Sequence, residues 1–282
     1  MTDRLPETLA HELRRHDRDR YLTTLFAPAE RRCALIALYA FNFEVAKTRE
    51  IVREPLLGRI RLQWWRESID AIYRGAPLRQ HEVIAPLAAA IRRHDLTRYH
   101  FDRLIDAREA DLADEPPADL AALERYADDS AARVVRLALE ILDTRDAESA
   151  EAGRDVGIAW SLVGLIRALP VHAGLRRLSL PADLVAETGL DMARFLEAKP
   201  SPALSRIVEH LAARAREHLA AARARHAAVA RGAVPALLTA RLAEFHLARF
   251  ARAGYDPFAP ALARPDTLAG WRLANAAWRG RF

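Results

Sequence analysis

Cysteine, lysine and long apolar runs are scarce in these 282 residues, and each scarcity excludes a class of protein. Cys33 is the only cysteine, so no internal disulfide framework can form, and we expect a reducing compartment. The longest apolar run, residues 33–41, is far too short to span a bilayer. The first residues mix both charges without an apolar core, which argues against a secretory signal. We therefore expect a cytoplasmic protein without a transmembrane helix, able at most to bind the inner face of a membrane peripherally.

Lysine occurs only at positions 47 and 199, so arginine carries almost all of the formal charge of +5. Such a surface suits an anionic partner: a phospholipid head group, a diphosphate or an acidic protein. A GC-rich genome would also explain the abundance of arginine and alanine. The basic segments contain no interleaved aromatic residues and no nucleic-acid-binding motif, so we expect no nucleic-acid partner.

Familiar catalytic motifs are missing as well. The chain contains no P-loop, no G-x-G-x-x-G and no G-x-S-x-G sequence. Its histidines do not show the spacing of metal ligands that pair with cysteine. The residues alone therefore predict no resident cofactor.

Apolar residues recur with helical spacing almost throughout, and no segment alternates as a strand does. With 51% hydrophobic and 29% charged residues, the chain can bury one large core, and we expect one all-α domain over residues 1–282. Proline and glycine mark the helix ends. The expected helices are 6–15, 18–26, 28–50, 55–74, 82–94, 97–112, 120–142, 149–169, 182–187, 192–196, 202–230, 234–253 and 266–278.

The stretch 154–181 organises the rest of the chain. It reads as a buried helix, a break at Pro170 and a basic loop that contains Arg176 and Arg177. On a helix, a stripe of small side chains lies beside the apolar face. Such a stripe allows close packing of another helix or leaves room for a guest molecule, and both alternatives stay open. The stripe consists of Gly157, Ser161, Gly164 and Ala168.

This stretch resembles the second signature of the squalene/phytoene synthase family, which joins two prenyl diphosphates head to head. The resemblance covers about residues 18–270 and implies an all-helical, isoprenoid-synthase-like bundle around a central hydrophobic pocket. The matching residues are Asp155, Gly157, Ala159, Leu162, Arg167, Leu180 and Pro181.

The positions that the resemblance assigns to metal-binding aspartates are mostly not acidic. Ala168 and His172 occupy them in the second signature, and Ala46 replaces the first aspartate of the first signature. Only Glu50 keeps a carboxylate there, and Phe43 replaces the arginine that would hold a diphosphate. Because Mg²⁺ needs several oxygen ligands, one glutamate cannot rebuild the family's cage. No catalytic residue is therefore assigned.

Another family segment is changed too. Tyr126 matches a family tyrosine, but Asp128 stands where the resemblance implies a second tyrosine beside the reacting isoprenoid. The basic loop would close over the site in the family, although a solvated turn explains it equally well. The pocket residues that the resemblance implies are Tyr39, Phe43, Tyr126, Asp128, Gly157, Ser161, Gly164, Arg167, Arg176 and Arg177.

A relocated metal site is the alternative. Asp106, Asp111 and Asp155 could form an acidic wall that binds Mg²⁺, and the protein would then be an active prenyl-diphosphate transferase. A third alternative is an interaction scaffold with a filled core.

The altered positions themselves resemble an aspartate-poor branch of the family, the mitochondrial complex I assembly factors. The shared features are an "AFN" sequence followed by an acid at residues 40–44, and an "LRA-x-P-x-H" type stretch before "LP-x-D". We interpret the chain as a bacterial relative of that branch. The resemblance then implies a pseudoenzyme that binds an isoprenoid or lipid and assists assembly of a respiratory complex, with a membrane surface or a respiratory subunit as partner.

Overall fold

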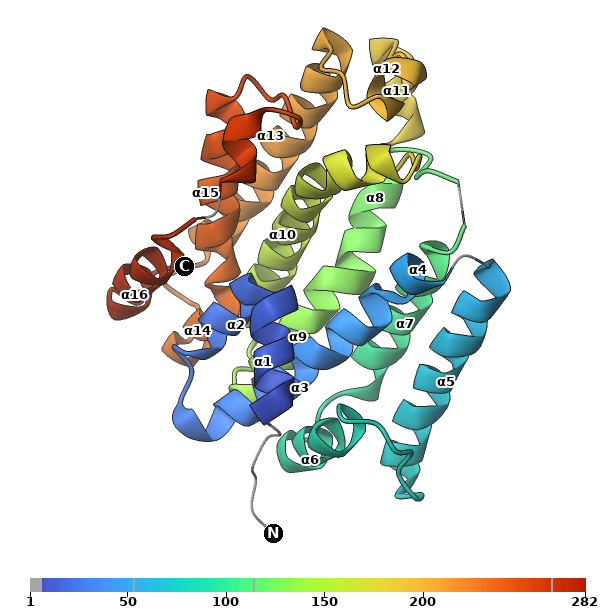
Figure 1. Ribbon diagram of the computed structural model, residues 1–282. Helices are drawn as coiled ribbons and strands as arrows, with labels where there is room; N and C mark the ends of the chain where they lie inside the picture. The colour runs from blue at the N-terminus through green and yellow to red at the C-terminus, as the bar shows by residue number, and fades with distance from the viewer. Residues whose placement is uncertain (1–6, 53, 114, 265) are drawn as a thin grey trace.

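A computed structural model of the chain describes residues 7–52, 54–113, 115–264 and 266–282. These residues form helices and connecting turns without a strand, which confirms the all-α prediction (Figure 1). The predicted helix start at Pro6 lies outside the described residues. The α-helices are α1 (Glu7–His16), α2 (Arg18–Thr24), α3 (Ala29–Ala46), α4 (Thr48–Ile51), α5 (Pro55–Arg74), α6 (Ile84–His94), α7 (Arg98–Ala110), α8 (Leu120–Ala127), α9 (Arg133–Ile141), α10 (Ala147–Gly174), α11 (Ala182–Thr188), α12 (Met192–Leu196), α13 (Pro202–Ala224), α14 (Val234–Leu237), α15 (Thr239–Arg252) and α16 (Ala269–Trp278).

Two helices, α3 and α10, form the interior of the bundle. α10 packs against α9, α13 and α15, and α3 packs against α1, α6 and α9 (Figure 1). In α3, 11 of 18 residues are buried, and in α10, 14 of 28, and the buried residues of both helices spread around the helix rather than along one narrow stripe. The buried apolar residues of the described chain join into one continuous core.

Local sequence explains where several helices begin and end. Pro55 occupies the first turn of α5, and Gly75 ends that helix with φ +66°, as predicted. Side-chain oxygens cap the start of several other helices: Asp119 accepts from the amide of Ala122 at 2.6 Å at the start of α8, and Asp146 and Ser201 cap α10 and α13 in the same way.

The long helices differ from the prediction at several points. α13 ends at Ala224 instead of residue 230, and the predicted helix 234–253 is divided at Leu238. The predicted break at Pro170 is wrong, because α10 continues to Gly174 and its last turn keeps backbone bonds such as Leu175 N–H to Val171 at 2.9 Å. The predicted helix 120–142 is interrupted by a π-helical turn at 128–132, where the Ser130 hydroxyl donates to the Tyr126 carbonyl at 2.6 Å. The predicted helix 28–50 is divided at Lys47.

α10 also has the length and apolar composition of a membrane-spanning helix. More than half of its most apolar window, 56%, is buried inside the bundle. Among the described helices, only α10 meets this criterion, and its central position explains the apolarity as that of a core helix.

Candidate functional site

A cavity of about 920 Å³ lies between the α1–α2 junction, α10, α15 and the loop that leads to α16. Its wall is divided by chemistry, since one part is charged and the other is apolar. The charged and titratable lining residues are Arg15, His16, Asp17, Arg18, Asp19, Arg20, Arg167, His246, Arg249, Arg264 and Asp266. The apolar lining includes Trp160, Leu242, Phe250, Pro257, Phe258 and Leu262.

Each aspartate in the cavity wall already has an arginine partner. Asp17 pairs with Arg20 at 2.7 Å, and Asp19 pairs with Arg167 at 2.9 Å. The third, Asp266, pairs with Arg272 at 3.3 Å. The wall is therefore electropositive overall. Four of its arginines have no carboxylate partner among the described residues: Arg15, Arg18, Arg249 and Arg264.

His246 lies within this basic surrounding and is neutral. Burial, followed by the charges of Arg167 and Arg249, lowers the pKa of His246 to about 3. Its ring lies 6.4 Å from the ring of Trp160, over which the Arg167 guanidinium sits at 5.6 Å. The apolar wall and the cationic rim therefore meet at this point.

The small-residue stripe of α10 serves two purposes at two positions. A Cβ atom at Gly157 would lie 2.4 Å from Cα and 2.8 Å from N of Ala132, so Gly157 packs against the π-helical turn and does not line the cavity. A Cβ atom at Gly164 would meet nothing within 4 Å, and Gly164 borders the cavity. Both alternatives for the stripe are therefore realised, each at its own glycine. Ser161, between them, is half-buried.

The four altered signature positions do not offer the ligands of a magnesium site. Ala46 and Ala168 are half-buried and have no donor atom, and Glu50 is exposed on the short α4. Burial and the nearby Arg177 lower the pKa of His172, which leaves a neutral imidazole at neutral pH. Mg²⁺ prefers six oxygen ligands in octahedral geometry, so these residues do not fit it.

Phe43 and Tyr39 lie beside the cavity without lining it. Phe43 stacks on His16 with ring centroids 4.9 Å apart, and the Lys47 ammonium lies 4.9 Å from the Phe43 ring. Tyr39 is buried, with Arg20 over its ring at 6.0 Å, and burial raises its pKa to about 12. Both therefore support residues that line the cavity.

A separate polar cluster joins the end of α7 to the loop after α10. The Tyr126 hydroxyl donates to Asp111 at 3.0 Å, and Arg108 donates to both Asp111 and Tyr126. Burial raises the pKa of Tyr126. Arg177 donates to the Asp111 carbonyl at 3.2 Å, whereas Arg176 is exposed with φ +55°. These groups hydrogen-bond to one another, although Nε of Arg108 is buried without a partner among the described residues, and none of them lines the cavity.

The carboxylates of the predicted acidic wall do not come together. Asp106 pairs with Arg66 at 2.7 Å, and Asp155 accepts from His218 at 2.9 Å, while Asp111 belongs to the tyrosine cluster. Asp128 is also held, by Arg154 at 2.9 Å. In the part of the chain that the structure describes, no group of three or more His, Cys, Asp or Glu side chains is arranged to hold a metal ion.

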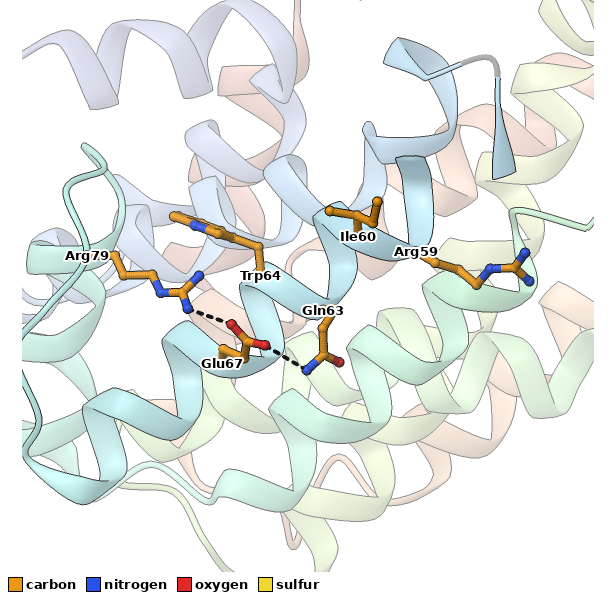
Figure 2. Close-up of a pocket in the computed structure, with 6 residues that line it drawn as sticks. All are labelled: Arg59, Ile60, Gln63, Trp64, Glu67 and Arg79. Atoms are coloured by element: carbon orange, nitrogen blue, oxygen red, sulfur yellow. Dashed lines mark hydrogen bonds and ion pairs between the residues drawn. The ribbon is translucent and has the colours of Figure 1, made fainter. Parts of the chain in front are cut away.

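A smaller groove of about 350 Å³ runs along the outer face of α5. Figure 2 shows Trp64 and Ile60 on its apolar side. Within it, Glu67 accepts from Arg79 at 2.5 Å and from Gln63 at 3.1 Å (Figure 2). The neighbouring Trp65 is fully buried in the core.

The comparisons with known proteins agree with the fold. A sequence model described as squalene/phytoene synthase matches residues 13–274. This chain belongs to the squalene/phytoene synthase family. A solved squalene synthase from Alicyclobacillus acidocaldarius superposes with a TM-score of 0.77 at 22% identity, covering 89% of this chain and 94% of the other, which shows the shared fold.

Two curated relatives represent both branches of the squalene/phytoene synthase family. NADH dehydrogenase (ubiquinone) complex I, assembly factor 6 of Bos taurus is 34% identical over 270 residues, which is 96% of this chain and 81% of the relative. Presqualene diphosphate synthase of Rhodopseudomonas palustris is 31% identical over 217 residues, 74% of this chain and 77% of the relative. The predicted resemblance to the assembly-factor branch is therefore confirmed.

Most residues around the cavity of this family member were not singled out from the sequence. His246 and Arg249, for example, carry no motif that marks them as site residues. The dense charges of residues 15–20 and the proline-rich stretch 257–265 were visible signals. Neither could be assigned to a cavity, because more than 200 residues separate them and only folding brings them together.

Proposed function

We propose that this member of the squalene/phytoene synthase family is a non-catalytic protein that binds an isoprenoid or lipid and assists assembly of respiratory complex I. The observation that carries the proposal is the cavity beside Gly164, in which arginines outnumber carboxylates, while only Glu50 keeps a carboxylate at the magnesium positions.

The cavity has the two kinds of wall that an anionic amphiphile needs. Trp160, Leu242 and Phe250 offer an apolar surface for a hydrocarbon chain. Arg249 and Arg15 offer guanidinium groups free of carboxylates, and guanidinium binds phosphate oxygens in a bidentate manner. A head group of phosphate or diphosphate therefore needs no metal ion to be held here.

Prenyl transfer requires more than binding. Mg²⁺ stabilises the diphosphate leaving group in this chemistry, and arginine alone holds a phosphate without the geometry of a metal-bridged site. Because Ala46, Ala168 and His172 supply no carboxylate, we infer that a bound prenyl diphosphate is retained unchanged.

The test of binding is titration of the purified protein with farnesyl diphosphate, in EDTA and again in excess Mg²⁺, with pyrophosphate release measured in parallel. We expect binding in EDTA and no pyrophosphate release in either buffer. Binding that requires Mg²⁺ and releases pyrophosphate would establish the alternative, an active prenyl-diphosphate transferase with a relocated metal site.

Two variants locate the ligand. Gly164→Phe places a benzyl group in part of the cavity and is expected to weaken binding at least about tenfold. Gly174→Phe is the matched control, because Gly174 is exposed near the end of the same helix and does not line the cavity. Arg249→Gln keeps the fold and removes one charge-assisted contact, an effect of about ten- to a hundredfold on affinity. Equal affinity in all three variants would place the ligand elsewhere.

The proposed role in assembly is supported by the curated relatives named as complex I assembly factors. Deleting the gene in its source organism should lower the amount of mature complex I on native gels. Re-expression of the wild type should restore it, and Gly164→Phe should not. Restoration by Gly164→Phe would separate assembly from the cavity and leave the scaffold alternative.

A further inference from the structure

The helix α16 presents two tryptophans to solvent. Its inner face, Ala269, Leu273 and Ala276, is buried, and the helix packs against α2 and α15. On its outer side, Trp271 is 78% exposed and Trp278 is 85% exposed, with Leu268 in the preceding turn 54% exposed. Positions 268, 271 and 278 project within one side of a helix with 3.6 residues per turn. The outer side of α16 is therefore an apolar face without a partner among the described residues.

Packing within this fold does not explain why tryptophan stands at positions 271 and 278. Neither Trp271 nor Trp278 has a ring partner or a hydrogen bond in the described part of the chain. The other three tryptophans each contact another ring, with Trp65 fully buried. Indole has an apolar body and one polar N–H group, a combination enriched where protein meets the interface of a bilayer.

The charge around this face has one sign. Residues 267–282 contain three arginines and no acidic residue. Arg272 is held by Asp266 and lies over the Phe245 ring at 4.1 Å, but Arg279 and Arg281 are exposed and have no carboxylate partner among the described residues. Tryptophan beside unpaired arginine matches the surface of an anionic bilayer, where cations meet head groups and rings enter the interface.

We propose that the outer face of α16, formed by Leu268, Trp271, Trp278, Arg279 and Arg281, docks the protein on an anionic phospholipid surface. A second copy fits this face less well, because a two-fold contact would bring its arginines together without an acid to pair them. The face lies at the edge of the bundle opposite α5 (Figure 1). The proposal does not rest on the cavity ligand or on complex I.

The test uses the full-length protein and vesicles of phosphatidylcholine with or without phosphatidylglycerol, separated by flotation. We expect binding to the vesicles that contain phosphatidylglycerol, a blue shift of tryptophan emission, and quenching by lipids with brominated acyl chains. Added salt should weaken binding because the electrostatic part is screened. Wild type that stays unbound on anionic vesicles, or that binds neutral vesicles equally well, overturns the proposal.

Matched variants test whether the outer face of α16 is the surface that binds the vesicles. Trp271→Ala/Trp278→Ala should weaken vesicle binding on the order of tenfold or more, as should Arg279→Gln/Arg281→Gln at low salt. The control, Leu56→Ala/Ile60→Ala, removes exposed apolar side chains from α5 and should leave binding unchanged. All these side chains are exposed, so the unfolding midpoints should equal that of the wild type. Equal binding by the tryptophan variant, or loss of a self-associated form on sedimentation instead, contradicts the proposal.

Discussion

Replacing Gly157 by alanine tests the packing that sets the position of α10. A Cβ atom there would lie 2.4 Å from Cα, 2.8 Å from N and 2.9 Å from Cβ of Ala132. None of these atoms is the end of a flexible side chain, so the backbone of the π-helical turn or of α10 has to move. The same register of α10 places Gly164 beside the cavity two turns later.

The expected size follows from two opposing effects. Alanine in place of glycine favours a helix by about 0.5–1 kcal/mol. Inserting a methyl group into a packed core usually costs about 1–3 kcal/mol, and a clash with backbone atoms lies at the upper end of that range. We therefore expect a net loss of about 2 kcal/mol in the free energy of unfolding, or a melting midpoint lower by about 4–8 °C.

The assay is urea and thermal unfolding of Gly157→Ala beside Gly164→Ala. At Gly164 a Cβ atom meets nothing within 4 Å, so Gly164→Ala changes only the helix preference. Its free energy of unfolding should rise by up to about 1 kcal/mol. If Gly157→Ala proves as stable as Gly164→Ala, the close approach of α10 to Ala132 does not require glycine at position 157. The explanation of Gly157 as a packing residue then fails.

Two further predictions concern stability. Because burial lowers the pKa of His246 to about 3, below its value in the unfolded chain, the folded state fails to take up a proton that the unfolded state binds. The free energy of unfolding should therefore fall as the pH drops from about 6.5 toward 3, and this group can contribute no more than about 1.4 kcal/mol per pH unit. Unfolding curves measured at several pH values should show a smaller fall for His246→Gln than for the wild type. Asp155→Ala should lower the free energy of unfolding by about 1–3 kcal/mol because it leaves His218 without its 2.9 Å partner, whereas Asp106→Ala, at an exposed pair, should change it by about 0–1 kcal/mol. Equal unfolding curves for Asp155→Ala and Asp106→Ala would show that the buried network carries no stability.

The positions of most helices follow from local signals in the sequence. The ends of α5 coincide with the prediction, because Pro55 and Gly75 act through their own backbone geometry. The end of α10 does not, since a proline removes only one hydrogen bond and surrounding contacts can retain the helix beyond it. Local rules therefore predict a helix end best where the residue determines it alone.

Some features of the candidate site could likewise be predicted from the sequence, and others could not. The loss of carboxylates at Ala46, Ala168 and His172 is visible in the sequence, because a missing donor needs no structure to be recognised. The two uses of the glycine stripe could not be separated, because Gly157 and Gly164 look alike until their neighbours are placed. The acidic wall was an error of the same origin, since sequence spacing does not reveal which arginine each aspartate meets.

The sequence by itself determined an all-α protein of the squalene/phytoene synthase family whose metal positions are changed. Helical periodicity and signature residues are local in the chain, so they can be recognised without coordinates. Only the tertiary structure decided which charges are neutralised and which face open space. Arg249 and the residues 15–20 share a cavity wall, and Trp271 and Trp278 remain uncovered, because contacts between distant segments, rather than residue type, set burial and pairing.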